Sequence, residues 1–449
     1  MPVTTNDRSR RHRDRTAYLL ATVASAVLVS MLSLAWQPRI DFGGGRGWDG
    51  RIYGDMADTL AAGRRPCGPA PYVFRIGTPL LAAVLSRSLG LQVNRSVVDQ
   101  SFLILNLIAA VLSVVLLYYF LLPHVRPLTA WIACCLFMIP WHAPLRFVAF
   151  YPVYVDPWFF VFWIAGLLLI SNPRMFSGIG VASLGVLTFV GVVFREAVML
   201  VPLTLLLSTP IVGDLARRTL SCLLGVHPPR PEARSFGTGR GPAIAVALLC
   251  GIVGVALTRL IPTVAFSDYS FWYSTLSWIA DTHLVGFTGA LFLAYGPALL
   301  LLVIRWRDVA AKLRSDATYL STLVLVVTLG MSGGSDTVRL LFWGAPVVLL
   351  LVAVCLEKIV TDWRSSARDR RTERWLWLWL GLMLICQLSS SLVFVRLNAS
   401  IAPILGIPNR SLPFTSIMLT GHVLVAGILL LLFRMAERRR KSLELQDVH

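Results

Sequence analysis

The sequence predicts an all-α, polytopic membrane protein with about twelve transmembrane helices. The chain has 449 residues, of which 56% are hydrophobic and only 14% are charged. Its mean hydropathy is +0.71. Apolar runs recur along the whole length, and about 20 apolar residues are enough to cross the hydrocarbon core of a bilayer. A soluble domain cannot bury this much apolar surface, so the composition favours a membrane protein.

The apolar runs define the expected transmembrane helices. The first run follows a cluster of arginines, is long for the apolar region of a signal peptide, and has no convincing cleavage site after it, which predicts a retained first helix. Several runs, such as 197–211, are short, which predicts broken or tilted helices. The expected helices lie near residues 17–36, 99–122, 127–145, 156–171, 175–194, 197–211, 241–260, 283–305, 318–332, 338–356, 375–395 and 414–433.

The distribution of Lys and Arg predicts the orientation of the chain in the inner (plasma) membrane. With a cytoplasmic N-terminus, most basic residues and all three lysines fall on the cytoplasmic side, and both termini of the transmembrane domain 17–433 face the cytoplasm. This distribution explains the net charge of +18 without a nucleic-acid partner. The cytoplasmic segments are then the basic N-terminus 1–16, the loops 123–126, 172–174, 306–317 and 357–374, the flexible linker 212–240, and the basic tail 434–449.

The first external loop, residues 37–98, is long enough to hold structure of its own. Residues 76–92 are apolar, but Ser86 and Arg87 interrupt the run, and one more crossing would place the later basic loops outside. We therefore expect 76–92 to lie in the outer interface or to form a re-entrant element. Residues 51–62 have an amphipathic helical pattern and are expected to behave similarly.

Ionisable side chains gather on the predicted external side, although they come from distant parts of the chain. Each has an ordinary alternative: Asp49 lies in a turn, Asp156 before Pro157 is typical of a helix N-terminus, and Arg195 can pair with its neighbour Glu196. Their convergence on one face favours a functional site. The group contains Asp49, Asp55, Arg75, Asp156, Arg195, Glu196, Asp336 and Arg339.

The order of these motifs resembles that of actinobacterial membrane proteins of the GT-C glycosyltransferase superfamily. The resemblance begins with WDGRIYGDMA, which contains Asp49 and Tyr53, and continues with PYVFRIGTPLLAAVL, which contains Arg75. It extends to an acidic residue that opens a helix, to an Arg-Glu pair after a helix, and to Asp-x-x-Arg before a helix with a proline. In this chain those positions are Asp156, Arg195, Glu196, Asp336, Arg339 and Pro346.

The resemblance implies transfer of a sugar from a polyprenyl-phosphate donor to a glycan or lipid acceptor on the non-cytoplasmic face, with inversion. It implies that Asp49 is the base or positions the acceptor, with Asp55 as its rival. Arg75, Arg195 and Arg339 would hold the donor phosphate, and Asp156, Glu196 and Asp336 would bind hydroxyl groups; Tyr53 belongs to the substrate-binding set.

Two features depart from the better-known members of that superfamily. The chain lacks a C-terminal soluble domain, and Asp49 and Asp55 are six positions apart instead of adjacent. No Cys/His spacing resembles a zinc site. We therefore predict neither a metal nor a cofactor.

Two other functions stay open at the level of sequence. Twelve helices with both ends inside are also a common plan for a transporter or flippase, although no internal repeat is visible and the charges lie near one face. A catalytically silent scaffold with the same fold is the third possibility. The sugar, the acceptor, the lipid length and the oligomeric state do not follow from the sequence. The preference for Arg over Lys suggests a high-GC genome, such as that of an actinobacterium.

Overall fold

The structure is a computed structural model. It describes residues 5–89, 94–172, 176–209, 240–264, 271–281, 284–333 and 336–366, and near the C-terminus 374, 377–388, 421, 423–435 and 437–438. In these ranges the regular structure is helical, and β pairing is limited to one isolated bridge between Gly68 and Thr263. The predicted all-α class is confirmed for this part of the chain. The predicted linker 212–240, apart from Arg240, and most of the tail 434–449 lie outside the described residues.

Each predicted transmembrane segment contains helix, with corrections at the ends. The longer helices are α1 (Thr5–Trp36), α4 (Arg95–Leu121), α5 (Pro127–Met138), α7 (Asp156–Ser171), α8 (Gly178–Phe194), α11 (Arg240–Thr258), α16 (Ala317–Ser332) and α18 (Ala345–Ser366). Two further apolar helices span Trp377–Leu388 and Val423–Met435.

Several predicted helices are broken; a short apolar run predicted this for 197–211, whereas the breaks in 127–145 and 283–305 correct the prediction of single helices. Segment 127–145 is not one helix: α5 ends at Met138, and a separate helix α6 (Pro144–Phe150) follows Pro140, whose ring cannot continue a helix. Segment 197–211 begins as a 3₁₀ helix η3 (Glu196–Met199) before α9 (Leu200–Leu207). Segment 283–305 divides into α13 (Leu284–Tyr295), η4 (Gly296–Ala298) and α14 (Leu299–Ile304), and α17 (Thr337–Phe342) precedes α18.

Four described helices are long and apolar enough to cross a membrane, and a fifth crossing results if α15 (Trp306–Ser315) and α16, bent by 107°, count as one. The four cover Arg13–Trp36, Arg95–Leu121, Arg240–Thr258 and Gly286–Ile304. Aliphatic side chains on three of them, such as Leu20, Ile108 and Leu249, are exposed and suit contact with lipid. The total of about twelve crossings and the orientation of the termini stay predictions.

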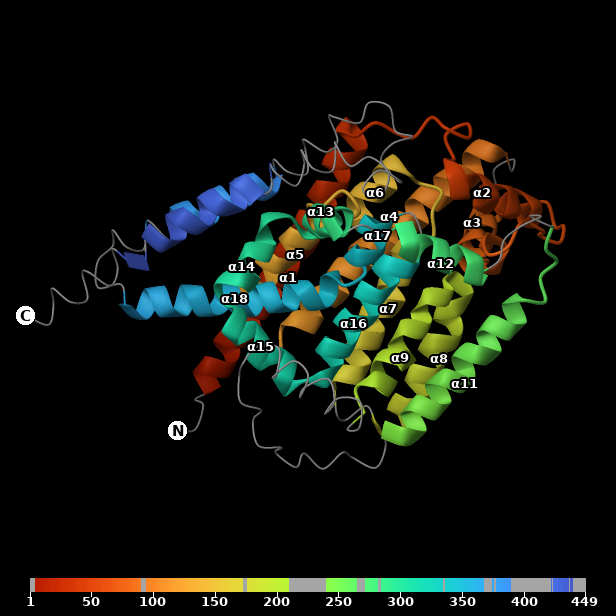
Figure 1. The fold of residues 1–449 in the computed structure, drawn as a ribbon. Coiled ribbons are helices and arrows are strands. Elements are labelled where there is room, and N and C mark those ends of the chain that lie inside the picture. The colour runs from red at the N-terminus through yellow and green to blue at the C-terminus, as the bar shows by residue number, and fades with distance from the viewer. Residues whose placement is uncertain are drawn as a thin grey trace, which may run out of the picture.

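The first loop folds against the bundle through two short helices, α2 (Trp48–Ala61) and α3 (Gly77–Ser88). Tyr53, Met56 and Phe102 are among the side chains of a small apolar core that α2 and α3 share with the start of α4. Figure 1 shows α2 and α3 side by side at one end of the bundle, with the N-terminus of α1 toward the other end. At 12 residues, α3 is about 18 Å long, too short to cross a bilayer. Its interfacial position stays a prediction.

Another short helix, α12 (Phe271–Asp281), in a segment predicted to be external, lies near α16. The main core involves α4, α5, α7 and α18 among others. Within it the indole of Trp163 donates to the carbonyl of Trp343 at 2.9 Å. The rings of Phe137, Phe160 and Phe342 pack on one another nearby. The Trp163–Trp343 hydrogen bond links the middle of α7 to the end of α17, and both helices carry charged residues of the predicted site.

Cysteine labelling tests the predicted orientation. Cys67 is exposed in the first loop, whereas the other described cysteines are buried or half-buried. Cys222 is predicted to be cytoplasmic. A membrane-impermeant maleimide should label Cys67 in right-side-out vesicles and Cys222 only after permeabilisation, with Cys67→Ser and Cys222→Ser variants identifying the labelled positions. Labelling in the reverse order would mean that the predicted orientation is inverted.

Candidate active site

Arg75 connects the first loop to the break between α8 and α9. It follows the 3₁₀ helix η1 (Tyr72–Phe74), and its guanidinium is buried. Its Nε donates to Glu196 Oε2 at 2.9 Å, Nη2 pairs with the other carboxylate oxygen, and Nη1 donates to the Tyr53 hydroxyl at 3.0 Å. Burial alone would lower the pKa of Arg75. The nearby Glu196 carboxylate counteracts burial, and the pKa of Arg75 is raised above its usual value. Burial raises the pKa of Tyr53 to about 12, so its hydroxyl stays protonated.

Asp156 and Arg195 form a buried ion pair between the start of α7 and the end of α8. The sequence allowed Asp156 to be a simple helix cap. In the structure Val155 occupies the N-cap position and makes no side-chain cap, and the Asp156 carboxylate instead accepts from the Tyr154 hydroxyl at 2.5 Å. The guanidinium of Arg195 also lies 4.7 Å from the ring centre of Trp343. Asp156 lies in the first turn of α7, but its carboxylate takes part in a polar network and does not cap the helix.

Arg339 joins this pair to α17. Its Nη1 donates to the Tyr154 hydroxyl at 2.7 Å, so one phenol links Arg339 to Asp156. Its Nε lies 3.4 Å from Asp336 and 3.8 Å from Asp156, longer than a strong charged hydrogen bond. Asp336 caps α17 by accepting from the backbone N–H of Arg339, and it lies 3.5 Å from His142 Nε2.

Asp49 lies in the first turn of α2 and is half-buried. Its carboxylate has no hydrogen bond or ion pair to any described residue, yet its charge acts on Tyr53, Tyr151 and Arg339. The backbone N–H of Gly50 donates to the Tyr151 hydroxyl at 2.6 Å. A side chain at position 50 would come within 2.3 Å of a backbone oxygen, so the glycine lets α2 approach the segment after α6. Asp49 is thus held in place while its carboxylate is free to interact.

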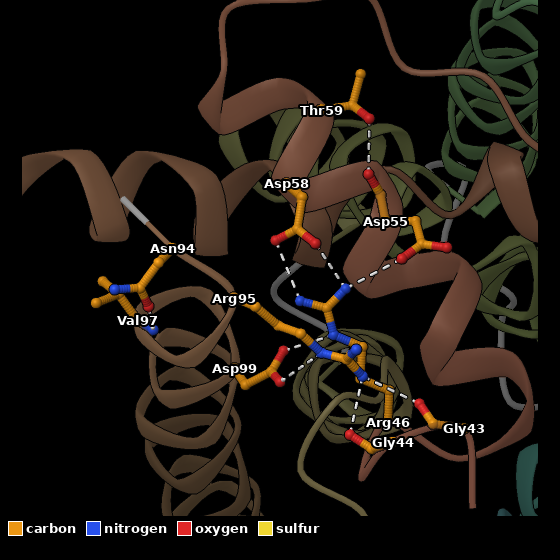
Figure 2. Close-up of polar contacts among 10 residues, drawn as sticks. All are labelled: Gly43, Gly44, Arg46, Asp55, Asp58, Thr59, Asn94, Arg95, Val97 and Asp99. Atoms are coloured by element: carbon orange, nitrogen blue, oxygen red, sulfur yellow. Dashed lines mark hydrogen bonds and ion pairs between the residues drawn. The ribbon is translucent and has the colours of Figure 1, made fainter. Parts of the chain in front are cut away.

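Asp55 belongs to a different cluster, centred on Arg46 (Figure 2). The side chain of Arg46 is 1% exposed and bonds Asp55, Asp58 and Asp99 at distances from 2.7 to 3.1 Å. Burial lowers the pKa of Arg46, but the hydrogen bonds that Arg46 donates to Asp58 and Asp99 and the charges of these two carboxylates together outweigh burial and raise the pKa. Asp55 itself is 64% exposed and lies on the face of α2 away from Tyr53.

The Arg46 cluster fixes the loop that carries Asp49. Four glycines around Arg46 have positive φ, which lets the chain turn tightly between α1 and α2. Arg95, at the start of α4, donates to the carbonyls of two of them, Gly43 and Gly44, at 3.0 and 2.8 Å, as Figure 2 shows. Together with Asp99 of α4, these bonds hold the loop and the start of α2 on the end of α4.

The structure brings most of the predicted site into two groups of hydrogen-bonded and ion-paired side chains, Tyr53–Arg75–Glu196 and Asp156–Arg195–Arg339–Asp336, which meet at the consecutive residues Arg195 and Glu196. Asp49 lies beside these groups, and Asp55 belongs to the Arg46 cluster. Sequence reasoning missed Tyr154, His142 and Arg46. A usable signal was present for Arg46, since an arginine within a glycine-rich loop needs a partner when it is buried. No group of three metal-ligating side chains occurs among the described residues.

Solved structures similar to this chain include two of archaeal oligosaccharyltransferase. No protein-family model and no curated protein matches the chain. The oligosaccharyltransferase AglB from Archaeoglobus fulgidus, in complex with an inhibitory peptide and a dolichol-phosphate, is similar with a TM-score of 0.46 and 13% identity over 94% of this chain. The Archaeoglobus fulgidus oligosaccharyltransferase tethered to an acceptor peptide gives a TM-score of 0.48 and 12% identity over 87%. The match covers 56% and 55% of those two chains.

Replacing Arg46 should destabilise the first loop. Arg46→Met leaves three carboxylates without their shared cation, and we expect a loss of about 2 kcal/mol, reduced from a fully buried pair because the acids are partly exposed. Arg51→Met, at an exposed position on the following helix α2, should stay within about 0.5 kcal/mol of the parent. Thermal unfolding in detergent measures both, and equal melting temperatures for the two variants would contradict a stabilising role for Arg46.

Proposed function

We propose that this protein is a GT-C-type membrane glycosyltransferase. It would transfer a sugar from a polyprenyl-phosphate donor to a lipid or cell-envelope glycan acceptor, with inversion, on the non-cytoplasmic face of the plasma membrane. The observation that supports this most directly is the Tyr154 hydroxyl, which joins Asp156 and its partner Arg195 to Arg339, beside the separate Arg75–Glu196 pair. Charged groups are costly near a bilayer, so a buried network of this size favours a binding or catalytic role over ordinary packing.

The three arginines differ in how fully they are bonded. Arg75 is occupied by Glu196 and Tyr53, and in this proposal it positions these two side chains. Arg339 is 20% exposed, its Nε has no hydrogen bond to a described residue, and its carboxylate partners lie at 3.4 and 3.8 Å. Arg339, supported by Arg195, therefore has the capacity to bind a phosphate oxygen of the donor.

The lipid tail of the donor needs an apolar surface beside this site. On α3, Leu80 and Val84 are exposed and four residues apart, so they lie on one face of the helix. The opposite face packs Ala82, Ala83 and Ser86 into the protein. We propose that the polyprenyl chain lies along Leu80 and Val84, with its phosphate directed toward Arg339.

Asp49 is the carboxylate best placed to be the base. Asp156 and Glu196 are held by arginines, which keeps their charge engaged, whereas Asp49 has no such partner among the described residues. In the proposed step the acceptor oxygen bonds to the anomeric carbon as the bond from that carbon to the phosphate oxygen breaks. The hydroxyl proton passes to Asp49, and the electron pair leaves on the phosphate. Asp156, Glu196 and Asp336 would orient hydroxyl groups of the sugar or acceptor.

Asp49→Asn should abolish most of the transfer. Loss of a general base costs about 100-fold or more in turnover, measured as sugar release from a panel of polyprenyl-phosphate sugars by purified protein in lipid. Asp41→Asn, at an exposed position in the same loop, is the control and should keep full activity. Asp55→Asn should keep most activity, because the Asp55 carboxylate is bonded to Arg46.

Other outcomes of the same assay assign other functions. If Asp55→Asn is inactive and Asp49→Asn is active, the base is Asp55. If folded protein transfers no sugar from any donor but moves a lipid-linked precursor across the bilayer, the protein is a transporter or flippase. If the protein shows neither sugar transfer nor lipid transport, it is a catalytically silent scaffold.

Arg339→Gln should weaken binding of the donor. Losing one charge-assisted contact with a phosphate corresponds to roughly a tenfold rise in KM for the donor. Arg339→Lys should recover part of this, since a lysine keeps the charge without the planar pair of donors. Arg64→Gln, an exposed arginine of the first loop, serves as the control. An unchanged KM for the donor in Arg339→Gln would exclude the proposed phosphate contact.

A further inference from the structure

A cleft lies at the opposite end of the bundle from the candidate active site. It has a volume of about 520 Å³ and is lined by Arg15, Thr16 and Leu19 of α1 and by Tyr118, Tyr119, Leu122 and Pro123 at the end of α4. The start of α4 contacts α2 and α3, and α4 has 27 residues, so the cleft is about 40 Å away from that end. The cleft therefore has no part in the proposed transfer reaction.

The polar part of the cleft consists of Arg15 and two tyrosines. The Tyr118 hydroxyl donates to the backbone carbonyl of Arg15 at 2.9 Å, which ties α1 to α4 at this point. The Arg15 side chain is exposed and makes no hydrogen bond or ion pair with a described residue. Tyr119 is 46% exposed. A free guanidinium beside a phenol is suited to an anion such as a phosphate.

The rest of the cleft is apolar and continues toward the middle of the membrane. Leu19 and Leu122 form its walls. Farther along the same helices, Leu20 on α1 and Ile108 and Leu112 on α4 are exposed. Arg15 lies at the start of an apolar helix that is long enough to cross the bilayer, which places its charge at the level of the lipid headgroups. A cation at headgroup level above apolar walls matches an amphipathic ligand.

We propose that this cleft binds an anionic phospholipid from the leaflet predicted to be cytoplasmic. The lipid phosphate contacts Arg15, Tyr119 lies beside the headgroup, and an acyl chain extends past Leu19 toward Leu112. The bound lipid would fix α1 against α4.

Lipid titration with matched variants tests the proposal. The full-length protein is purified in a neutral detergent, titrated with phosphatidylglycerol or phosphatidylcholine, and the bound lipids are counted by native mass spectrometry. Wild-type protein should prefer phosphatidylglycerol. Arg15→Gln should reduce its affinity for phosphatidylglycerol roughly tenfold, whereas Arg13→Gln, two residues away and outside the cleft, should have little effect. Binding of phosphatidylcholine should be the same in all three proteins.

A second variant tests the cleft without changing charge. Leu122→Trp fills the cavity and should also reduce binding of phosphatidylglycerol, with the melting temperature of the lipid-free protein reporting that it is folded. Equal reductions in Arg15→Gln and Arg13→Gln would show diffuse attraction to positive charge and overturn the proposal. So would equal wild-type affinities for the two lipids, or unchanged binding in Leu122→Trp. Sugar transfer is not measured in this experiment, so its result is independent of the proposed function.

Discussion

The buried ion pair between Asp156 and Arg195 is the interaction on which the site depends. It joins the start of α7 to the end of α8, and both side chains are almost completely buried. Removing one partner of such a pair leaves an uncompensated charge in a medium that solvates it poorly, which is far more costly than losing an exposed pair. The pair therefore constrains two apolar helices, whose packing by itself permits sliding and rotation, to one relative position.

Tyr154 extends this constraint to α17. Its hydroxyl donates to Asp156 and accepts from Arg339, so both functions of one phenol are used. Arg75 provides a similar extension on the other side, where it ties Tyr53 of α2 to Glu196 at the helix break. Two sets of polar contacts thus meet at the consecutive residues Arg195 and Glu196, one reaching toward the first loop and the other toward α17. Opposite charges are paired within each set, which lowers the cost of placing them among apolar helices.

A separate set of contacts holds the first loop in place. Arg46 forms ion pairs with three carboxylates of α2 and α4, and Arg95 donates hydrogen bonds to the glycine carbonyls of the same turn. These contacts set the position of α2 and hence of Asp49, without occupying the Asp49 carboxylate. The residues that hold the loop are different from the residue that is available for chemistry. The Asp49 carboxylate therefore stays free, while the neighbouring Asp55 and Asp58 are bonded to Arg46. This separation is the structural basis for preferring Asp49 over Asp55 in the proposed mechanism.

The helical class and the approximate positions of the longer apolar helices could be predicted from the sequence alone, because the length of an apolar run and the charges at its ends are local properties. The short helices α6, α12 and α15 could not. The sequence also indicated Arg75, Asp156, Arg195 and Arg339 as one group, since ionisable residues near apolar runs need partners. Which partners they find was decided only by tertiary structure. Asp156 resembles a helix cap in sequence, but it pairs with Arg195, and Asp55 resembles a second base, but it bonds Arg46. Pairing of this kind depends on how distant helix ends pack together, and no local pattern in the chain encodes that packing.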